Sequence, residues 1–265
     1  MDFENIILKK EDGVATITFN RPDTMNSLNP KLADDLHPCL DDVEKDDSVK
    51  VIVITGAGRG FCSGADLSTI TTPGVFESII QKKEWIQGAG ENFVKRLMNL
   101  EKLVITSVNG PAIGAGFSFA LAGDIIIASE KARFQMVFVN IGLVPDGGSL
   151  LILPRLVGIA KAKELCFNGD MLDAKEAERI GLINRVVPAD ELEAETKKLA
   201  LRYAKGPSKS LGFMKKIINI GLATNNLDTV MAHEAQAQVL LFETEDFKEG
   251  VKAFLEKRPP QFKGK

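Results

Sequence analysis

Residues 109–149 carry the side chains and glycines whose types and spacing could do chemistry. A glycine-rich turn with Gly110, Gly114 and Gly116 follows an apolar β-branched run and precedes small apolar residues. Glycine lets the backbone turn sharply and approach a ligand closely. The first N–H groups of a following helix have no helical partner, so they favour negative charge. With Asp146 later in the same stretch, the pattern indicates an anion-stabilising site beside one carboxylate; a packed strand–helix turn with a capping aspartate is the alternative.

A second glycine-rich stretch, residues 55–67, also follows an apolar run. Gly56, Gly58 and Gly60 invite comparison with a dinucleotide-binding turn. The GxGxxG spacing would need a glycine at Phe61, so the sequence does not favour such a site. Cys62 could be a nucleophile, but neither histidine is close to it in sequence, and a small packed thiol is the simpler interpretation.

Composition limits the classes of protein that the chain can belong to. Its 265 residues are 45% hydrophobic and 26% charged with a net charge of −3, as in ordinary soluble globular proteins. A slightly negative net charge does not indicate nucleic-acid binding, which normally requires a basic surface. Three widely spaced cysteines without a CxxC pair argue for a reducing compartment and against a metal site. With no signal peptide or membrane-length apolar run, we expect a cytoplasmic protein without a membrane partner.

The elements that must position these residues follow from periodicity. A hairpin through residues 11–13, a helix that starts at Asn29-Pro30, and a buried strand over residues 49–54 predict a βαβ unit. Residues 104–108 and 124–128 predict two further buried strands, and residues 150–157 and 160–167 predict buried helices. From residue 190 onward the sequence predicts helices only. These helices carry too few core residues to form an independent domain.

Residues 76–100 have helical patterning that Gly88 and Gly90 interrupt. The interruption and the polar residues before it favour either a mobile segment over the site or a surface helix pair. The sequence leaves both interpretations open.

The chain resembles the crotonase (enoyl-CoA hydratase/isomerase) superfamily over nearly its whole length. The resemblance rests on motifs in matching order: Phe19-Asn20-Arg21-Pro22, Asn26-Ser27-Leu28, Gly60-Phe61-Cys62-Ser63-Gly64-Ala65-Asp66-Leu67, Val108-Asn109-Gly110-Pro111-Ala112, Gly114-Ala115-Gly116, Asp124, Ala132-Arg133-Phe134 and Gly142. It implies an α/β fold, a crotonase-like spiral of ββα turns over residues 1–190. It also implies a helical C-terminal region, residues 191–265, that packs on the core and on neighbouring subunits in a homotrimer or a dimer of trimers.

The resemblance further implies an acyl-CoA thioester as the substrate and no metal or other cofactor. It places the oxyanion hole at the backbone N–H groups of Ala65 and Ala115, where two donors would stabilise a thioester enolate. The residues expected to bind CoA are Met25, Asn26, Ser27, Ser63, Gly64, Ala65, Asp66 and Leu67. Lys257 and Phe254 are expected to reach the CoA of a neighbouring subunit.

The two glutamates of the family's hydratases match Ser118 and Phe138 here, so the acid and base of ordinary water addition are missing. Asp146 matches the carboxylate of the family's isomerases, and the Gly-Leu-Val-Pro-Asp stretch and the C-terminal residues are most similar to the 1,2-epoxyphenylacetyl-CoA isomerase branch. We expect Asp146 to be the catalytic acid-base group. An acyl pocket should form from Phe117, Ser118, Phe138, Val139 and Val144, whose apolar members would exclude water and raise the Asp146 pKa.

The sequence therefore predicts an enoyl-CoA isomerase that moves a double bond from the 3- to the 2-position, on a chain or a ring-derived acyl group. Two alternatives remain: an enoyl-CoA hydratase with weak or unusual activity, and a non-catalytic acyl-CoA-binding protein. The fold does not separate them, because function resides in the site.

Overall fold

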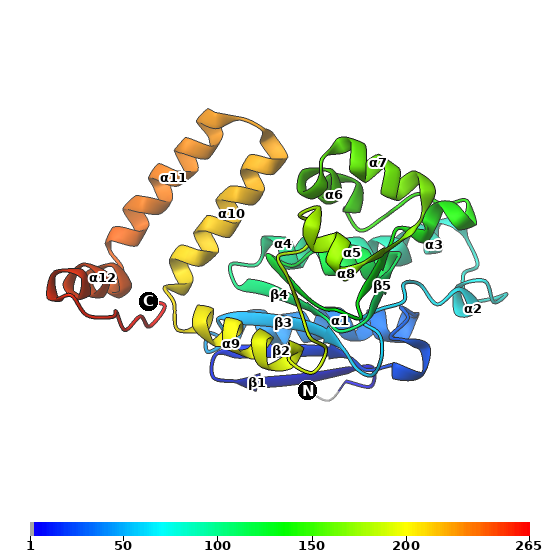
Figure 1. The fold of residues 1–265 in the computed structure, drawn as a ribbon, viewed down its shortest axis with the longest axis horizontal. Coiled ribbons are helices and arrows are strands. Elements are labelled where there is room, and N and C mark those ends of the chain that lie inside the picture. The colour runs from blue at the N-terminus through cyan, green and yellow to red at the C-terminus, as the bar shows by residue number, and fades with distance from the viewer. Residues whose placement is uncertain (1–2) are drawn as a thin grey trace.

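The computed structural model describes residues 3–265, which form an α/β body with a helical arm (Figure 1). A six-stranded sheet has the order β1-β2-β3-β4-β6-β9, and a smaller sheet has the order β5-β7-β8. Only the β1–β2 and β7–β8 pairs among these described strands are antiparallel. The strands are β1 (Ile6–Glu11), β2 (Val14–Phe19), β3 (Val51–Gly56), β4 (Leu103–Val108), β5 (Pro111–Ile113), β6 (Ile125–Ser129), β7 (Arg133–Gln135), β8 (Met171–Asp173) and β9 (Arg185–Val187).

The predicted hairpin and βαβ unit are confirmed. Asp12 and Gly13 turn the chain between β1 and β2 with φ of 52° and 79°. Helix α1 (Pro30–Glu44) begins where the sequence predicts, because the Asn29 side chain accepts a hydrogen bond of 2.9 Å from the Leu32 N–H. The parallel β2–β3 pair closes the unit.

Helices cover both faces of the main sheet. The larger core cluster includes buried side chains of α1, α4 (Asn92–Asn99) and α5 (Ala115–Leu121). On the other face, Val53, Ile105 and Ile127 pack with residues of α9 (Leu192–Ala204). The division between residues 1–190 and 191–265 stays a prediction, since α9, which follows residue 191, packs on the main sheet.

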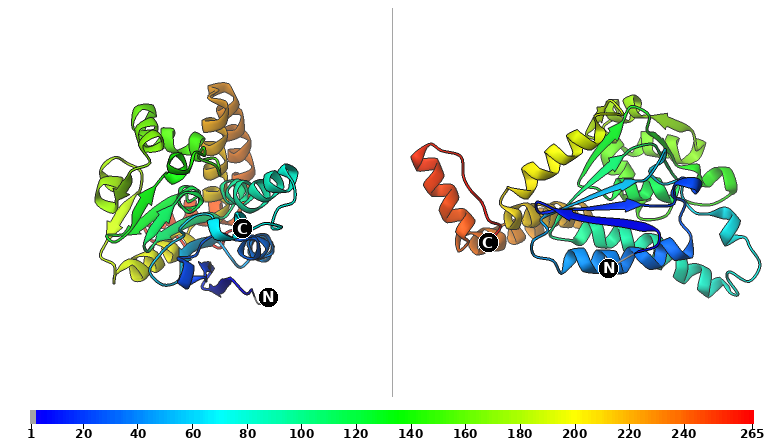
Figure 2. Two further views of the ribbon diagram at one scale, coloured as in Figure 1. Left: turned by 90° about the vertical axis from the view of Figure 1, so that its right-hand side faces the viewer. Right: turned by 90° about the horizontal axis from the view of Figure 1, so that it is seen from below.

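Those later helices form an arm. Figure 1 shows α10 (Ser208–Thr224) beside the body, α11 (Leu227–Phe242) on the outer side of α10, and α12 (Glu245–Glu256) beyond the end of α11; Figure 2 gives two further views. The Asn219 side chain on α10 donates to the Met98 carbonyl at 2.8 Å, so α10 is attached to the body. The start of α10 packs tightly, since a Cβ at Gly212 would collide with the carbonyl oxygen of Glu101. Much of the remaining apolar surface of the arm is uncovered.

The remaining helices are short. The 3₁₀ helices η1 (Pro22–Thr24) and η3 (Val137–Ile141) lie in connections, and α8 (Ala174–Arg179) is capped by the Asp173 side chain. Residues 76–100 form α3 (Ile79–Trp85), the π-helical turn η2 (Ile86–Glu91) and α4. A four-residue helix, α2 (Leu67–Ile70), follows the second glycine-rich stretch.

One expectation about the fold is wrong. The helices α6 (Ser149–Val157) and α7 (Ile159–Asn168) form as predicted, but they are not buried on all sides. Leu150, Ile159 and Phe167 are 53%, 68% and 70% exposed. A helix that is apolar all round normally lies inside a core; here no other element of residues 3–265 covers the outer face.

Candidate active site

The two glycine-rich stretches meet side by side. The Cys62 N–H donates to the Pro111 carbonyl at 3.1 Å, and the Ile113 N–H donates to the Cys62 carbonyl at 3.0 Å. The start of α5 lies directly on this pairing, because a Cβ at Gly116 would collide with the Cys62 carbonyl oxygen. Glycine is therefore required at residue 116 for close backbone approach. Cys62 itself is fully buried, and burial raises the pKa of its thiol to about 12, so it is an inert packed thiol.

This pairing also brings Ala65 and Ala115 into one place. An added Cβ on Gly64, which has φ of 86°, would lie 3.5 Å from the Ala115 nitrogen. Ala115 is the first residue of α5, so its N–H has no partner within the helix. Within residues 3–265, neither the Ala65 nor the Ala115 amide donates a hydrogen bond to the rest of the chain. Two unused donors at this junction have the character that a developing oxyanion needs.

Asp146 lies three residues before α6, and two serine side chains hydrogen-bond its backbone. The Asp146 carbonyl oxygen accepts hydrogen bonds from Ser118 Oγ at 3.0 Å and from Ser149 Oγ at 2.7 Å. Gly147 follows with φ of 59°, and its hydrogen faces Ser118, because a Cβ there would lie 2.8 Å from Ser118 Cβ. Ser118 was predicted as a pocket residue, and the structure adds a positioning contact that its residue type alone does not reveal.

The Asp146 carboxyl group is unusual in its electrostatics. Its Oδ1 is buried and, within residues 3–265, has no hydrogen-bond partner. Burial, followed by the negative charge of Glu91, raises the pKa of Asp146 to about 6. An acid that titrates near neutral pH can both accept and return a proton, as an acid-base catalyst must.

The two segments predicted to bind CoA are also brought together. The Ser63 N–H donates to the Met25 carbonyl at 2.9 Å, and the Leu28 N–H donates to the Gly64 carbonyl at 2.7 Å. Met25 and Asn26 adopt φ of 50° and 58°, in the left-handed region that costs non-glycine residues energy. A tightly constrained loop of this kind holds its backbone in a fixed position.

Three predicted CoA-binding side chains are occupied within the protein. Asn26 is fully buried, and its amide accepts from the Arg21 N–H and donates to the Ala57 and Gly60 carbonyls. Asp66 caps α2 and pairs with Arg21 at 3.3 Å, while Ser27 also contacts the Arg21 side chain. These side chains stabilise the loop. The Asn26 side chain is therefore not free to contact CoA, and only its backbone or the neighbouring residues could do so. The sequence did not single out Arg21 as the residue that joins them.

The predicted acyl pocket is only partly formed by the single chain. Phe117 is 2% exposed and packs on Phe134 with ring centroids 5.4 Å apart. Phe138 is buried, and its ring lies beside Gly114. Val139 and Val144, by contrast, are 41% and 76% exposed. The expected continuous apolar wall over Asp146 is therefore incomplete in this chain, since the sequence reports the apolar character of a side chain but not what covers it.

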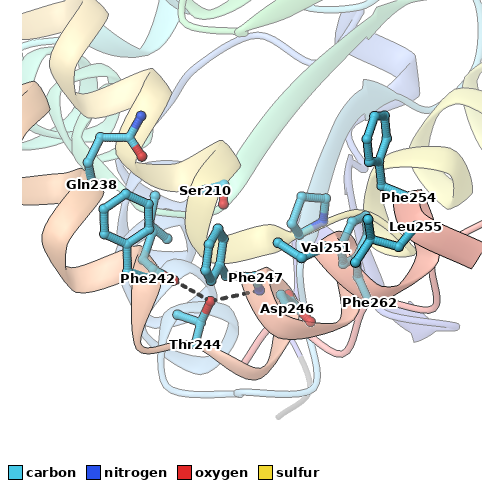
Figure 3. A pocket seen from close by; sticks show the side chains of 13 residues that line it. Ser210, Gln238, Phe242, Thr244, Asp246, Phe247, Val251, Phe254, Leu255 and Phe262 are labelled. Carbon is cyan, nitrogen blue, oxygen red and sulfur yellow. Dashed lines mark hydrogen bonds between the residues drawn. The ribbon is translucent and has the colours of Figure 1, made fainter.

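The C-terminal residues predicted to bind CoA lie elsewhere. Lys257 ends α12, at the opposite end of the molecule from α2 (Figures 1 and 2). Phe254 is 82% exposed and lines an apolar hollow of about 420 Å³ with Phe242, Phe247 and Phe262 (Figure 3). This hollow belongs to the arm and contains none of the residues around Asp146. In this chain, α12 thus lies far from α2, which follows the predicted CoA-binding segment, and the CoA role of Lys257 and Phe254 stays a prediction.

Two further findings concern the residues that the structure describes. No group of three or more His, Cys, Asp or Glu side chains within residues 3–265 is arranged to hold a metal ion. No helix in the same range combines the length and apolar character that crossing a membrane requires.

Comparison with known proteins places the chain among close relatives. The family model "Enoyl-CoA hydratase/isomerase" matches residues 9–265. The chain is 42% identical over 264 residues to 1,2-epoxyphenylacetyl-CoA isomerase of Escherichia coli K12, covering 99% of both chains. It is 39% identical to crotonyl-CoA hydratase of Syntrophomonas wolfei, again over 99% of both. A crystal structure of a putative enoyl-CoA hydratase from Streptomyces coelicolor superposes with a TM-score of 0.94 at 33% identity, covering 100% of this chain and 96% of that one.

Proposed function

The chain belongs to the enoyl-CoA hydratase/isomerase family and has the crotonase fold, and from this premise we propose that it is an acyl-CoA isomerase that converts a 3-enoyl-CoA into a 2-enoyl-CoA. One observation carries the proposal: Asp146 is a half-buried carboxyl group with a pKa of about 6, next to Ser118. Ser118 and Phe138 stand where the resemblance places the two glutamates of a hydratase. The site thus has one acid-base group, and moving one proton along the acyl chain requires only one.

The proposed reaction balances with Asp146 alone. The Asp146 carboxylate removes a proton from C2 of the 3-enoyl thioester, and the electron pair delocalises into a dienolate whose charge lies on the thioester oxygen. The N–H groups of Ala65 and Ala115 donate to that oxygen; such a donor is worth about 3 kcal/mol when removed from comparable sites. The protonated Asp146 then delivers the same proton to C4, which leaves the double bond between C2 and C3.

The surroundings of the site favour proton return over hydration. Adding water requires a base that activates the water and an acid that protonates the α-carbon. Ser118 is committed to the Asp146 carbonyl, and Phe138 cannot transfer protons. A hydratase that uses Asp146 and one bound water is the second candidate, and the named hydratase relative at 39% identity supports testing it directly.

The binding site for the CoA part of the substrate and the oligomeric state belong to the same proposal. We infer that CoA lies against the loop of Met25 to Ser27 and the segment from Ser63 to Leu67, and that no further cofactor takes part. The uncovered apolar residues of α10 to α12 support a homotrimer or a dimer of trimers. In a trimer, Lys257 and Phe254 would reach a neighbour's CoA. Light scattering at micromolar concentration should give a multiple of the 28.8 kDa chain, and a monomer would contradict the assembly.

One assay separates the candidate functions. The purified protein is incubated with short, long and aromatic 3-enoyl- and 2-enoyl-CoA thioesters, and the products are separated and identified by mass. An isomerase interconverts thioesters of equal mass without accumulating the hydroxyacyl product. A hydratase adds 18 mass units to the 2-enoyl substrate, and a binding protein retains the thioesters unchanged; either result would overturn the proposal.

A further inference from the structure

The Ala65 N–H, one of the two proposed oxyanion donors, takes its direction from the peptide group to which it belongs. The carbonyl of this peptide is that of Gly64, and it accepts a hydrogen bond of 2.7 Å from the Leu28 N–H. In a planar trans peptide the C=O and the N–H point in opposite directions. The Ala65 N–H therefore points away from Leu28, and no acceptor within residues 3–265 takes it. On the other side of Ala65, the Asp66 N–H donates to the Leu28 carbonyl at 2.8 Å, which completes the bridge between the two segments.

The Leu28 N–H is oriented in the same way, and here the group behind it is a cation. Its peptide carries the carbonyl of Ser27, and that oxygen accepts a hydrogen bond from Nη1 of Arg21. The guanidinium and the Ala65 N–H are thus joined through two peptide groups in series. Each hydrogen bond in such a chain polarises the next one, so the N–H at its end becomes a stronger donor.

Arg21 is itself fixed by contacts on both sides. Its backbone N–H donates to Asn26 Oδ1, and its carbonyl oxygen accepts from the Asn26 N–H, both at 2.8 Å. Its Nη2 pairs with Asp66 Oδ2 at 3.3 Å, and the two side chains are only 17% and 12% exposed. Asp66 offsets part of the positive charge, but it also fixes the direction of the guanidinium. A planar guanidinium can bind Ser27 and Asp66 together, which the single ammonium group of a lysine does less well.

The second proposed donor, the Ala115 N–H, has a different support. It shares its peptide with the Gly114 carbonyl. That carbonyl accepts from the N–H groups of Phe117 and Ser118 at 2.9 and 3.1 Å, in the first turn of α5. A helical turn therefore holds the Ala115 peptide, whereas the Ala65 peptide depends on the loop segment that Arg21 fixes.

We propose that Arg21 is a positioning residue for the thioester oxygen: it orients and polarises the Ala65 N–H through the two intervening peptide groups. The inference rests on the proposed function, because it takes the Ala65 N–H as an oxyanion donor. Negative charge grows on the thioester oxygen as the proton leaves C2, so a polarised donor stabilises the transition state more than the bound substrate. Loss of Arg21 should therefore lower kcat more than it raises KM.

The kinetic test compares wild type with Arg21→Met, Arg21→Lys and Arg96→Met. In Arg21→Met, kcat should fall by about 5- to 30-fold, less than the roughly 10²- to 10³-fold that complete loss of one such donor costs, and KM should stay within about threefold. Arg21→Lys keeps a positive donor and should recover part of the loss. Arg96→Met is the matched control, because Arg96 is also partly buried, pairs with two carboxylates and donates to the His37 carbonyl at 3.3 Å. Its kcat should stay near that of wild type.

An infrared measurement tests the same contact without turnover. The probe is hexanoyl-CoA labelled with carbon-13 at the thioester carbonyl, a saturated thioester that can be neither isomerised nor hydrated. Hydrogen-bond donors polarise this carbonyl, so its band should lie at lower wavenumber on wild type than in water. The shift should shrink in Arg21→Met, shrink less in Arg21→Lys and persist in Arg96→Met. An unchanged band in the folded Arg21 variants overturns the inference.

The outcomes distinguish this inference from the proposed function. If the band shift shrinks while the mass assay shows hydration, Arg21 keeps its role and the isomerase proposal fails. If wild type shows no band shift, the Ala65 N–H is not an oxyanion donor, and both the inference and the proposed mechanism are wrong. An Arg21→Lys protein no more active than Arg21→Met would attribute the loss to packing and overturn the role of Arg21. Should Arg21→Met fail to fold, the band of Arg21→Lys decides alone.

Discussion

Two half-buried carboxyl groups of this protein, Asp146 and Asp124, have opposite surroundings. Burial raises the pKa of both. Asp124 lies at the start of β6, where its Oδ2 accepts hydrogen bonds from Lys215 Nζ at 2.9 Å and from the Val104 N–H at 2.7 Å. Asp146 has a buried Oδ1 without a partner in residues 3–265.

The difference separates a structural acid from a reactive one. Lys215 is 5% exposed and also donates to the Leu97 and Lys102 carbonyls, so its pair with Asp124 attaches α10 to the body with its polar groups satisfied. An unpartnered buried oxygen costs folding free energy. Such a cost is typical of functional sites, where a group must remain available for a ligand.

Replacing Asp146 should give the largest effect in the molecule. Asp146→Asn keeps the shape of the side chain and removes the base, so turnover should fall by about 10²- to 10⁴-fold. Binding of acyl-CoA, measured by calorimetry, should change little, and exchange of the substrate's α-proton with deuterated solvent should stop. Asp190→Asn, at an exposed acid, is the control and should keep full activity. Near wild-type turnover in Asp146→Asn would refute the mechanism.

Breaking the Asp124–Lys215 pair should lower stability rather than activity. Lys215→Met leaves Asp124 as a buried carboxylate without its cation, and such losses cost about 3 to 5 kcal/mol. Urea denaturation should show this loss, with turnover per folded molecule preserved. The double variant with Asp124→Asn should recover part of the stability, because no charge is left unpaired. Equal stability of Lys215→Met and wild type would show that the two acids do not differ as described.

The same comparison predicts that the reactive acid destabilises the fold at neutral pH. The folded-state pKa of Asp146, about 6, exceeds that of the unfolded chain, so the folded state binds the proton more tightly. Its contribution to stability therefore falls as pH rises from about 4 to about 6 and is constant above that range. Asp146→Asn should be more stable than wild type by up to about 3 kcal/mol at pH 7, less where solvent screens the half-buried carboxylate, and equal to it below pH 4. Urea titrations at both pH values check the sign; a destabilised variant at pH 7 would contradict it.

Local sequence signals predicted much of the fold because they act within a few residues. The Asn29-Pro30 cap, the turn at Asp12-Gly13 and the β-branched runs each specify their element directly. Asp124, by contrast, pairs with Lys215, 91 positions away in the sequence, and no local pattern indicates such a contact.

The site was predicted less completely than the fold, because many of its contacts join residues that are far apart in the sequence. The glycine turns indicated close backbone approach, and the structure brings them together. Nothing in the residue types of Asn26 or Ser118 showed that their side chains would be used inside the protein. The exposure of Val144 and Ile159 likewise depends on what surrounds the chain, which an apolar residue does not reveal. The roles of Ala65, Ala115 and the CoA-binding residues stay predictions.

The smallest effect concerns a glycine in η2, the turn that ends at Glu91. Gly90 lies within η2, and a Cβ added there would meet no atom within 4 Å, unlike Gly212 on α10, where it would collide with backbone. Glycine in a helical turn costs about 0.5 to 1 kcal/mol relative to alanine through backbone entropy. Gly90→Ala should therefore raise the free energy of unfolding by about that amount, measured by urea denaturation, whereas Gly212→Ala should lower it. The pair of variants compares an open glycine in η2 with a packed glycine on α10, the helix that carries Lys215. If Gly90→Ala were destabilising, the π-helical backbone itself would require glycine, and the segment carrying Glu91 would be as constrained as the start of α10.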